Sequence, residues 1–195
     1  MRKTNLILLI TILLLSLQSY SQNSNELRIY YGISDSELLG YEEFYAGNYE
    51  YNNFNEIGIK YLRQIKNNFS VELGLNFLKL DIKHEMLMFP SGVLTDYEKL
   101  EIISVPIYAN YTFLEYLFIN GGPILDFQTS DNLDNSPSTS GIGYSIGIGG
   151  KYDFDKFLIF LNPNYKRHSV IPFKKENYPR KLTEFGIQFG VGYKF

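Results

Sequence analysis

The amino-acid sequence predicts an all-β protein, an eight-stranded antiparallel up-and-down transmembrane β-barrel. Three observations support this prediction. Apolar and polar residues alternate with a period of two in eight segments, and this is the periodicity of β-strands rather than helices. The connections between the segments are alternately long and short. One face of each segment is almost wholly apolar, whereas the other carries charged and amide side chains.

The eight expected strands follow one another along the chain. In the last of them, residues 185–195, bulky apolar residues alternate with glycine, Gln188 and Lys194. The alternation changes parity near Phe77 and Leu78, where we expect a bulge or the end of the packed zone. The alternating runs lie at residues 27–33, 57–61, 69–77, 103–113, 117–127, 142–148, 157–165 and 185–195.

Long and short connections alternate strictly, so an up-and-down meander places all the long ones at one end. Barrels of the outer membrane have this asymmetry, with short periplasmic turns and long external loops. Strands of about 10–14 residues, tilted by about 40°, reach across the roughly 25 Å apolar band. The expected long loops are residues 34–54, 84–96, 129–140 and 169–181, and the short turns are 65–68, 114–116 and 153–156.

The polar set of the strands is too rich in ions and amides to form a dry core without a large desolvation cost. We therefore expect this set to line the barrel interior and the apolar set to face lipid. Aromatic residues gather near both strand ends, where two interfacial belts are expected. With eight strands the interior is filled by side chains, so no general diffusion pore is predicted. The structural alternative is a soluble lipocalin-like ligand binder, whose apolar faces would turn inward.

The N-terminus has the features of a secretory signal peptide. Arg2 and Lys3 precede an apolar run from Leu6 to Leu17, and Ser19 and Ser21 have the spacing that signal peptidase recognises. We expect cleavage after Ser21, which leaves residues 22–195 as the barrel domain.

Composition excludes several classes of function. The chain has 195 residues and no cysteine, which excludes disulfides, a thiol nucleophile and zinc–thiolate sites. Removal of Arg2 and Lys3 leaves 16 basic and 21 acidic residues, a net charge of −5. This balance does not fit a nucleic-acid partner.

Two segments could suggest phosphate or calcium binding. The glycine-rich run 141–151 lacks the spacing of a phosphate loop, because Ser145 stands where glycine is needed and Tyr152 stands where serine or threonine is needed. Inward glycines that make room for neighbouring side chains explain it better. The run 131–135 lacks the spacing of a calcium loop. We expect no metal and no cofactor.

His84 and His168 are the two histidines. His168 and Ser169, with Glu176 or Glu184, suggest an esterase-like triad, but neighbours on a strand point to opposite faces. A solvated histidine at the base of a loop is therefore expected, and no catalytic residue.

Opposite charges flank the seam where the first and last strands meet. Residues 35–56 carry six acidic and no basic side chains, whereas residues 166–181 carry a net charge of +5. We hypothesise that the two loops attract each other and cap the barrel mouth. Alternatively, the basic loop binds the phosphates of lipopolysaccharide or another anionic lipid, or both loops are solvated without a partner. The basic residues concerned are Lys174, Lys175, Arg180 and Lys181.

The final strand resembles the signal that the outer-membrane barrel assembly machinery recognises, which typically ends in phenylalanine. The matching residues are Phe189, Val191, Tyr193 and Phe195. This resemblance implies a transient partnership with that machinery during biogenesis.

Residues 100–111, residues 117–123 and the glycine-rich sixth segment resemble the outer-membrane β-barrel domain family of Bacteroidota, which includes PorT-like proteins. The architecture is similar to the membrane domain of OmpA. The resemblance implies location in the cell outer membrane and carries over no catalytic residue. We expect a porin-like, non-enzymatic protein with a structural, adhesive or assembly role through its external loops. The alternatives are a narrow port for small or apolar solutes and, less favoured, a lipid-modifying enzyme.

Overall fold

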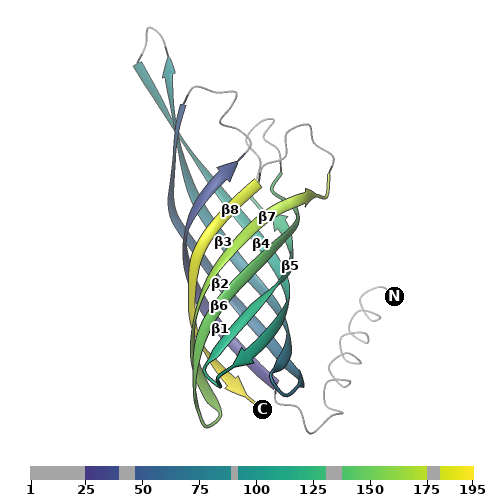
Figure 1. Cartoon of the computed structure of the whole chain (residues 1–195). Coiled ribbons are helices and arrows are strands. Elements are labelled where there is room, and N and C mark those ends of the chain that lie inside the picture. The colour runs from purple at the N-terminus through teal and green to yellow at the C-terminus, as the bar shows by residue number, and fades with distance from the viewer. Residues whose placement is uncertain (1–24, 40–46, 89–91, 131–137, 175–180) are drawn as a thin grey trace, which may run out of the picture.

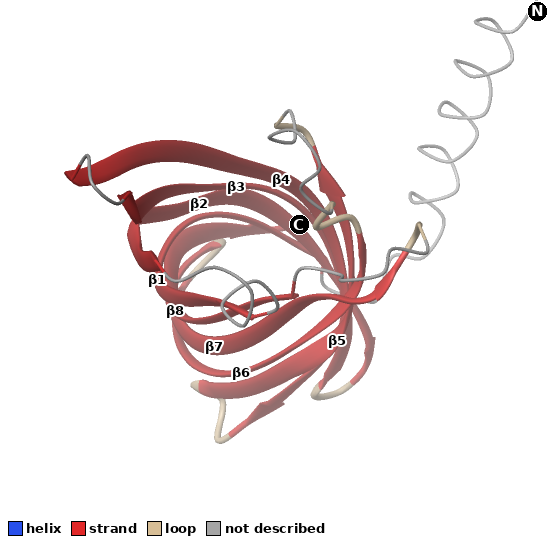
Figure 2. Cartoon of the chain, turned by 90° about the horizontal axis from the view of Figure 1, so that it is seen from above, coloured by secondary structure: helices blue, strands red, loops and turns tan. Residues whose placement is uncertain are grey.

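The protein is an eight-stranded barrel in which each strand is antiparallel to its neighbours. The computed structural model describes residues 25–39, 47–88, 92–130, 138–174 and 181–195, so the expected signal peptide lies outside the described residues. The strands are β1 (Asn25–Leu39), β2 (Gly47–Lys66), β3 (Phe69–Met88), β4 (Gly92–Phe113), β5 (Leu117–Gln128), β6 (Gly141–Phe154), β7 (Phe157–Pro172) and β8 (Lys181–Lys194). They form one closed ring in sequence order, as Figures 1 and 2 show. Within the described residues, no helix is long and apolar enough to cross a bilayer.

The ring closes where β1 pairs with β8, from Glu26 opposite Lys194 to Leu39 opposite Lys181. β8 is thus paired with β1 along its whole length. The three tight turns lie at the same end as the C-terminus (Figure 1). Left-handed residues form these turns, namely Asn67, Leu114, Glu115 and Asp155. The predicted strand order and the separation of turns from loops are confirmed.

Three strands are longer than the alternation predicts. β3 continues to Met88 and β4 begins at Gly92, so most of the expected loop 84–96 is a strand hairpin. The pairing of β1 with β2 ends at Ile33 opposite Asn55, whereas β2 continues to pair with β3 up to Gly47. Residues 47–54, 79–88 and 92–101 thus form a three-stranded extension beyond the ring (Figure 1). Cross-strand pairing holds the β3–β4 hairpin together in register, from Lys79 opposite Glu101 to Met88 opposite Gly92.

The orientation of the two faces is as predicted. Ile57 and Val191 are 58 % and 57 % exposed on the outside of the barrel, whereas Glu72 and Glu184 are 0 % and 1 % exposed inside it. The bilayer therefore contacts the apolar set, and the ions lie in the lumen. The soluble alternative with inward apolar faces is wrong.

The predicted parity change near Phe77 is also wrong. Asn76, Leu78, Leu80 and Ile82 are all buried, so the same parity faces the lumen along β3. The inward-facing residues change there from polar to apolar. In the sequence this change looks like a change in which parity faces inward. The register shift on this side of the barrel lies instead in β2, between Asn52 and Asn55.

Candidate functional site

Charged side chains pair inside the lumen, both between neighbouring strands and, in one case, between strands that are not neighbours in the ring. Lys166 of β7 lies 2.7 Å from Glu56 of β2 and 2.5 Å from Glu184 of β8. Lys60 of β2 lies 2.9 Å from Glu72 of β3. All five side chains are buried. Because a buried charge without its partner is costly, these pairs hold the walls together and fill the middle of the lumen.

Amide side chains complete this polar layer. Gln188 accepts a hydrogen bond of 2.8 Å from Lys60 and donates one of 3.0 Å to Glu56. Asn110 and Asn120 donate to Glu72, at 3.1 and 3.4 Å. The acceptors of the carboxylates are thus occupied by groups from several strands, as a desolvated charge requires.

Near the turn end of the lumen, Arg28 combines an ion pair with ring contacts. Its guanidinium lies 2.5 Å from Glu26, and Lys151 lies 3.3 Å from the same carboxylate. The guanidinium carbon is 5.4 and 5.1 Å from the ring centres of Phe118 and Phe160, within cation–π range. Charged and aromatic side chains therefore fill this end together.

At the loop end, the interior facing the long strands is apolar. Leu78, Leu80, Leu100 and Ile102 of β3 and β4 are fully buried and pack with Leu182 of β8. Phe54 and Ile82 belong to the same cluster. This apolar cluster lies inside the barrel, where the sequence analysis predicted polar residues, and it is the main feature that periodicity missed.

His168 is not the solvated histidine that the sequence predicted. It is fully buried, with Nδ1 3.0 Å from Asp126 and Nε2 3.6 Å from Glu184. Ser169 is buried as well, because a left-handed φ of 51° and a register shift opposite it turn two successive side chains inward. The side chain of His84 and all of Glu176 lie outside the part of the chain that the structure describes.

The group of His168, Ser169 and Asp126 is closed to solvent. A hydrolytic serine and histidine must reach a substrate, but His168, Ser169 and Asp126 have no exposed surface. The cluster serves structure: Ser104 donates a 2.6 Å hydrogen bond to Asp126 and so links β4 to β5.

The inward glycines of β6 leave space that side chains of neighbouring strands occupy, as predicted. A Cβ on Gly149 would lie 2.4 Å from the ring of Phe118, and one on Gly147 would lie 2.6 Å from Asn120. The outward Gly150 has no heavy atom closer than 3.9 Å to such a Cβ. The glycine-rich run is therefore a packing feature of a narrow lumen, and the phosphate-loop interpretation has no support.

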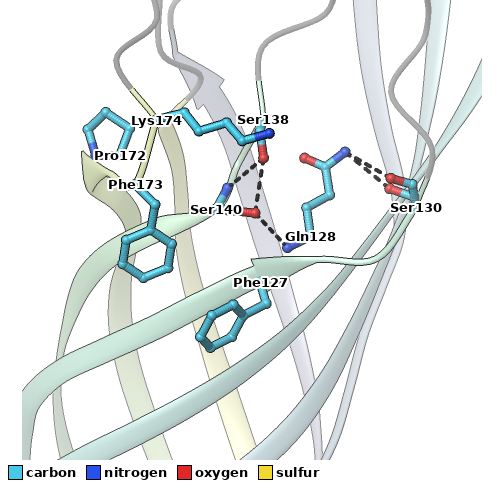
Figure 3. Close-up of a pocket in the computed structure, with 8 residues that line it drawn as sticks. All are labelled: Phe127, Gln128, Ser130, Ser138, Ser140, Pro172, Phe173 and Lys174. Atoms are coloured by element: carbon cyan, nitrogen blue, oxygen red, sulfur yellow. Dashed lines mark hydrogen bonds between the residues drawn. The ribbon is translucent and has the colours of Figure 1, made fainter.

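A rim pocket of about 410 Å³ lies at the loop ends of β5, β6 and β7 (Figure 3). Phe127 and Phe173 form one wall, with ring centres 5.5 Å apart. Lys174 points over the pocket toward Ser138 (Figure 3). The eight residues that line the rim pocket are Phe127, Gln128, Ser130, Ser138, Ser140, Pro172, Phe173 and Lys174.

Hydrogen bonds hold the polar wall of the rim pocket in place. The backbone N–H of Thr139 donates to the side-chain Oε1 of Gln128 at 2.8 Å, and the Thr139 hydroxyl donates to the same oxygen at 3.0 Å. This contact directs the amide nitrogen of Gln128 toward Ser130, at 3.3 Å. Ser138 and Ser140 are bonded to each other at 3.0 Å. The hydroxyls of the pocket are thus positioned before any ligand arrives.

A second hollow, of about 350 Å³, lies on the outer surface between β1 and β4. Ile29, Ile57, Leu75 and Ile103 are among the residues lining it, and all four are exposed on the lipid-facing side. Hydrocarbon chains fill such a space in a bilayer.

The predicted ligand-binding and assembly residues lie in different places. Lys174 is exposed at the rim pocket, Lys175 and Arg180 lie outside the described residues, and Lys181 begins β8 with its side chain undescribed. One acidic residue from 35–56 does meet a basic residue from 166–181, but this pair, Glu56 and Lys166, lies inside the lumen. The final-strand residues Phe189, Val191, Tyr193 and Phe195 all face outward.

The part of the chain that the structure describes contains no group of three or more potential metal ligands of the His, Asp or Glu type. The run 131–135 lies outside it. The rim pocket was not predicted from the sequence. Its signal in the sequence is a serine-rich stretch at 136–140 that follows the outward Phe127, but such a stretch reads equally well as an ordinary loop.

Comparisons with known proteins agree with this architecture. The model of a family described as outer membrane protein beta-barrel domain matches residues 7–195. No curated protein sequence matches the chain.

Solved structures similar to this barrel include the outer membrane protein OprG from Pseudomonas aeruginosa, with 12 % identity and a TM-score of 0.59, covering 91 % of this chain and 98 % of OprG. The outer membrane protein AlkL has the same identity and TM-score, covering 91 % of this chain and 92 % of AlkL. Ail, the attachment invasion locus protein of Yersinia pestis, has 15 % identity and a TM-score of 0.53, covering 90 % of this chain and 100 % of Ail. At these identities the likeness concerns the fold.

Proposed function

Because the chain belongs to the outer membrane β-barrel domain family and is a protein of the outer membrane, we propose that it is a non-enzymatic anchor for a partner-binding surface. The barrel spans the membrane with a closed lumen. The external loops and the three-stranded extension contact the partner. The role is structural, adhesive or one in assembly.

The observation that carries this proposal is a contact through the lumen between strands that are not neighbours in the ring. Lys166 reaches from β7 to Glu56 of β2, and the apolar cluster lies above this layer. A solute would have to separate buried ion pairs and then displace packed leucines. A barrel of eight strands is just filled by its own side chains, so closure is the expected state.

The extension supports a binding role. Among the described residues, residues 47–54 of β2 form no strand pairing with β1. Residues 92–100 of β4 likewise form none with β5. Strand edges of this kind offer backbone donors and acceptors to an added strand. Ail, whose barrel is similar, is known in complex with the heparin analogue sucrose octasulfate, an example of a ligand bound to a barrel of this shape.

Conductance measurements test the closed lumen. Purified protein in planar bilayers should give no large, stable current steps, whereas a sixteen-stranded porin prepared in the same way should. Such steps from this protein would contradict the proposal.

Adhesion tests the surface role. Cells with the wild-type chain should attach to heparin-coated or protein-coated surfaces more strongly than cells with a variant that lacks residues 86–94. The variant keeps the ring, which heat-modifiable mobility on gels verifies. Equal attachment of both strains would exclude an adhesive role for the extension.

As part of the same proposal, the protein has no enzymatic activity on lipid A. This absence is supported by the burial of His168 and Ser169. Lipid A from cells with and without the protein should have the same acyl composition, and a difference removed by His168→Gln would overturn this part.

A second candidate is a narrow port for small apolar solutes. Two observations favour it. The pairing of β1 with β2 ends at Ile33 opposite Asn55 although both strands continue, and the apolar cluster with Phe54 and Leu182 lies next to this point. Faster uptake of a small alkane by cells that carry the barrel would support it. Uptake at the rate of cells without the barrel would exclude it.

We also propose that Phe189, Val191, Tyr193 and Phe195 form the assembly signal, since all four lie outward on the closing strand. Deletion of Phe195 should lower the amount of barrel in the outer membrane of cells without preventing refolding of the purified chain. Normal cellular amounts would contradict this role.

Within the family, we place the chain with the PorT-like barrels of Bacteroidota, on the basis of residues 100–111 and 117–123. A phylogeny of barrel sequences that groups it elsewhere would refute this placement.

A further inference from the structure

We propose that the rim pocket binds the phosphorylated sugar headgroup of a glycolipid in the outer leaflet. The pocket combines an aromatic wall, positioned hydroxyls and an amide, and one cation. A volume of about 410 Å³ lies within the range of small-ligand sites.

The position of the pocket matches the depth of lipid headgroups. Phe127 and Phe173 are 44 % and 48 % exposed on the outer side of the barrel, next to the lipid-facing Ile171. Aromatic side chains at strand ends mark the interface between hydrocarbon and headgroups. A lipid whose acyl chains lie along β5 and β7 therefore brings its headgroup to the pocket.

The lining suits a sugar. Phe127 and Phe173 offer ring faces to the apolar C–H side of a pyranose, while serine hydroxyls can both donate and accept hydrogen bonds with sugar hydroxyls. Ser138 and Ser140 are held by their mutual hydrogen bond, and Thr139 fixes the amide of Gln128. Such positioning reduces the entropy lost on binding.

The charge of the pocket favours an anion. Lys174 is the one ionisable residue among the eight that line it, and its side chain is exposed. Its ammonium extends over the pocket (Figure 3) and offers three donors to a phosphate. An uncharged sugar lipid would leave this group without a role, so a phosphate on the sugar is the better fit.

Native mass spectrometry of the barrel in phosphatidylcholine nanodiscs tests the proposal. The probes are bisphosphorylated lipid A, the same lipid without phosphates, and free glucosamine 1-phosphate. Bisphosphorylated lipid A should bind most tightly, and Lys174→Glu should weaken it by about tenfold or more, which is about 1.4 kcal/mol. The control Lys156→Glu changes an exposed lysine at the turn end and should leave binding unchanged.

Two further variants test the aromatic wall and the serine hydroxyls of the rim pocket. Phe173→Ala should weaken both forms of the lipid to a similar degree, because ring stacking does not depend on phosphate. Ser138→Ala combined with Ser140→Ala should weaken binding while heat-modifiable mobility shows an intact barrel.

Equal binding of the two lipid forms, or no effect of Lys174→Glu, would overturn the phosphate assignment. Free glucosamine 1-phosphate binding as tightly as the lipid would overturn the lipid assignment. The rim pocket shares no residue with the ion pairs or the apolar cluster that close the lumen, so neither result affects the conductance test of the proposed anchor.

Discussion

The long strands β2 to β4 and the shorter strands β5 to β8 form two sides of one ring with the same outer surface and different interiors. Outside, both sides present isoleucine, leucine and phenylalanine to lipid. Inside, at the loop end, the long strands carry Leu78, Leu80 and Leu100, which Leu182 of β8 joins, whereas β5 and β7 carry Asp126 and His168. The bilayer dictates the outer face everywhere, but nothing requires a uniform lumen.

The two interiors match the two structures above them. The apolar cluster lies at the base of the three-stranded extension, because Phe54, Leu80, Ile82 and Leu100 belong to both. The buried polar group of Asp126, His168 and Ser169 lies below the rim pocket, near the loop ends of β5 and β7. The chemistry of the lumen thus reflects what each side of the barrel carries outside the membrane.

The largest effect is expected from the polar interior. Lys166→Met leaves Glu56 and Glu184 buried without their cation and should lower the free energy of unfolding by about 4 kcal/mol. Urea unfolding in lipid vesicles, followed by gel mobility, measures it. The double variant Lys166→Met with Glu184→Gln should recover part of the loss. Wild-type stability of the single variant would show that the ion pairs do not hold the walls.

The apolar interior should give a smaller loss. Leu100→Ala removes a fully buried side chain and should cost about 3 kcal/mol in the same unfolding measurement. The matched control is Leu75→Ala, which changes a lipid-facing leucine whose space acyl chains can fill. If both variants lose the same stability, the apolar cluster is no core and the contrast between the two sides fails.

The smallest effect concerns the narrowness of the lumen beside β6. Gly149→Ala places a methyl group against Phe118 and the backbone of Leu161, and should cost about 2 kcal/mol through overpacking. Gly150→Ala, one residue later on the opposite face, places its methyl group no closer than 3.9 Å to any neighbouring heavy atom and should be nearly neutral. Equal stability of the two variants would mean that the lumen is wider than its contacts indicate.

Much of this architecture could be predicted from alternation alone. Residues 185–195 and 141–151 show the period of two directly, and the glycines of the second run were correctly explained by crowding. The rim pocket could not be predicted in this way. It joins residues from 127–130, 138–140 and 172–174, and only closure of the ring brings these strand ends together.

Two errors show the limit of periodicity. Leu78 and Leu80 face inward although leucine predicts the lipid side, because the lumen itself becomes apolar there. His168 and Ser169 both face inward because a left-handed residue interrupts the alternation, and a single sequence gives no sign of that bulge.

The sequence by itself determined the number of strands, their order and the face that meets lipid, because these follow from local alternation and from the solvent on each side. Only the tertiary structure decided which charge meets which across the lumen, as in Lys166 with Glu56, since the stagger and closure of the ring fix those distances.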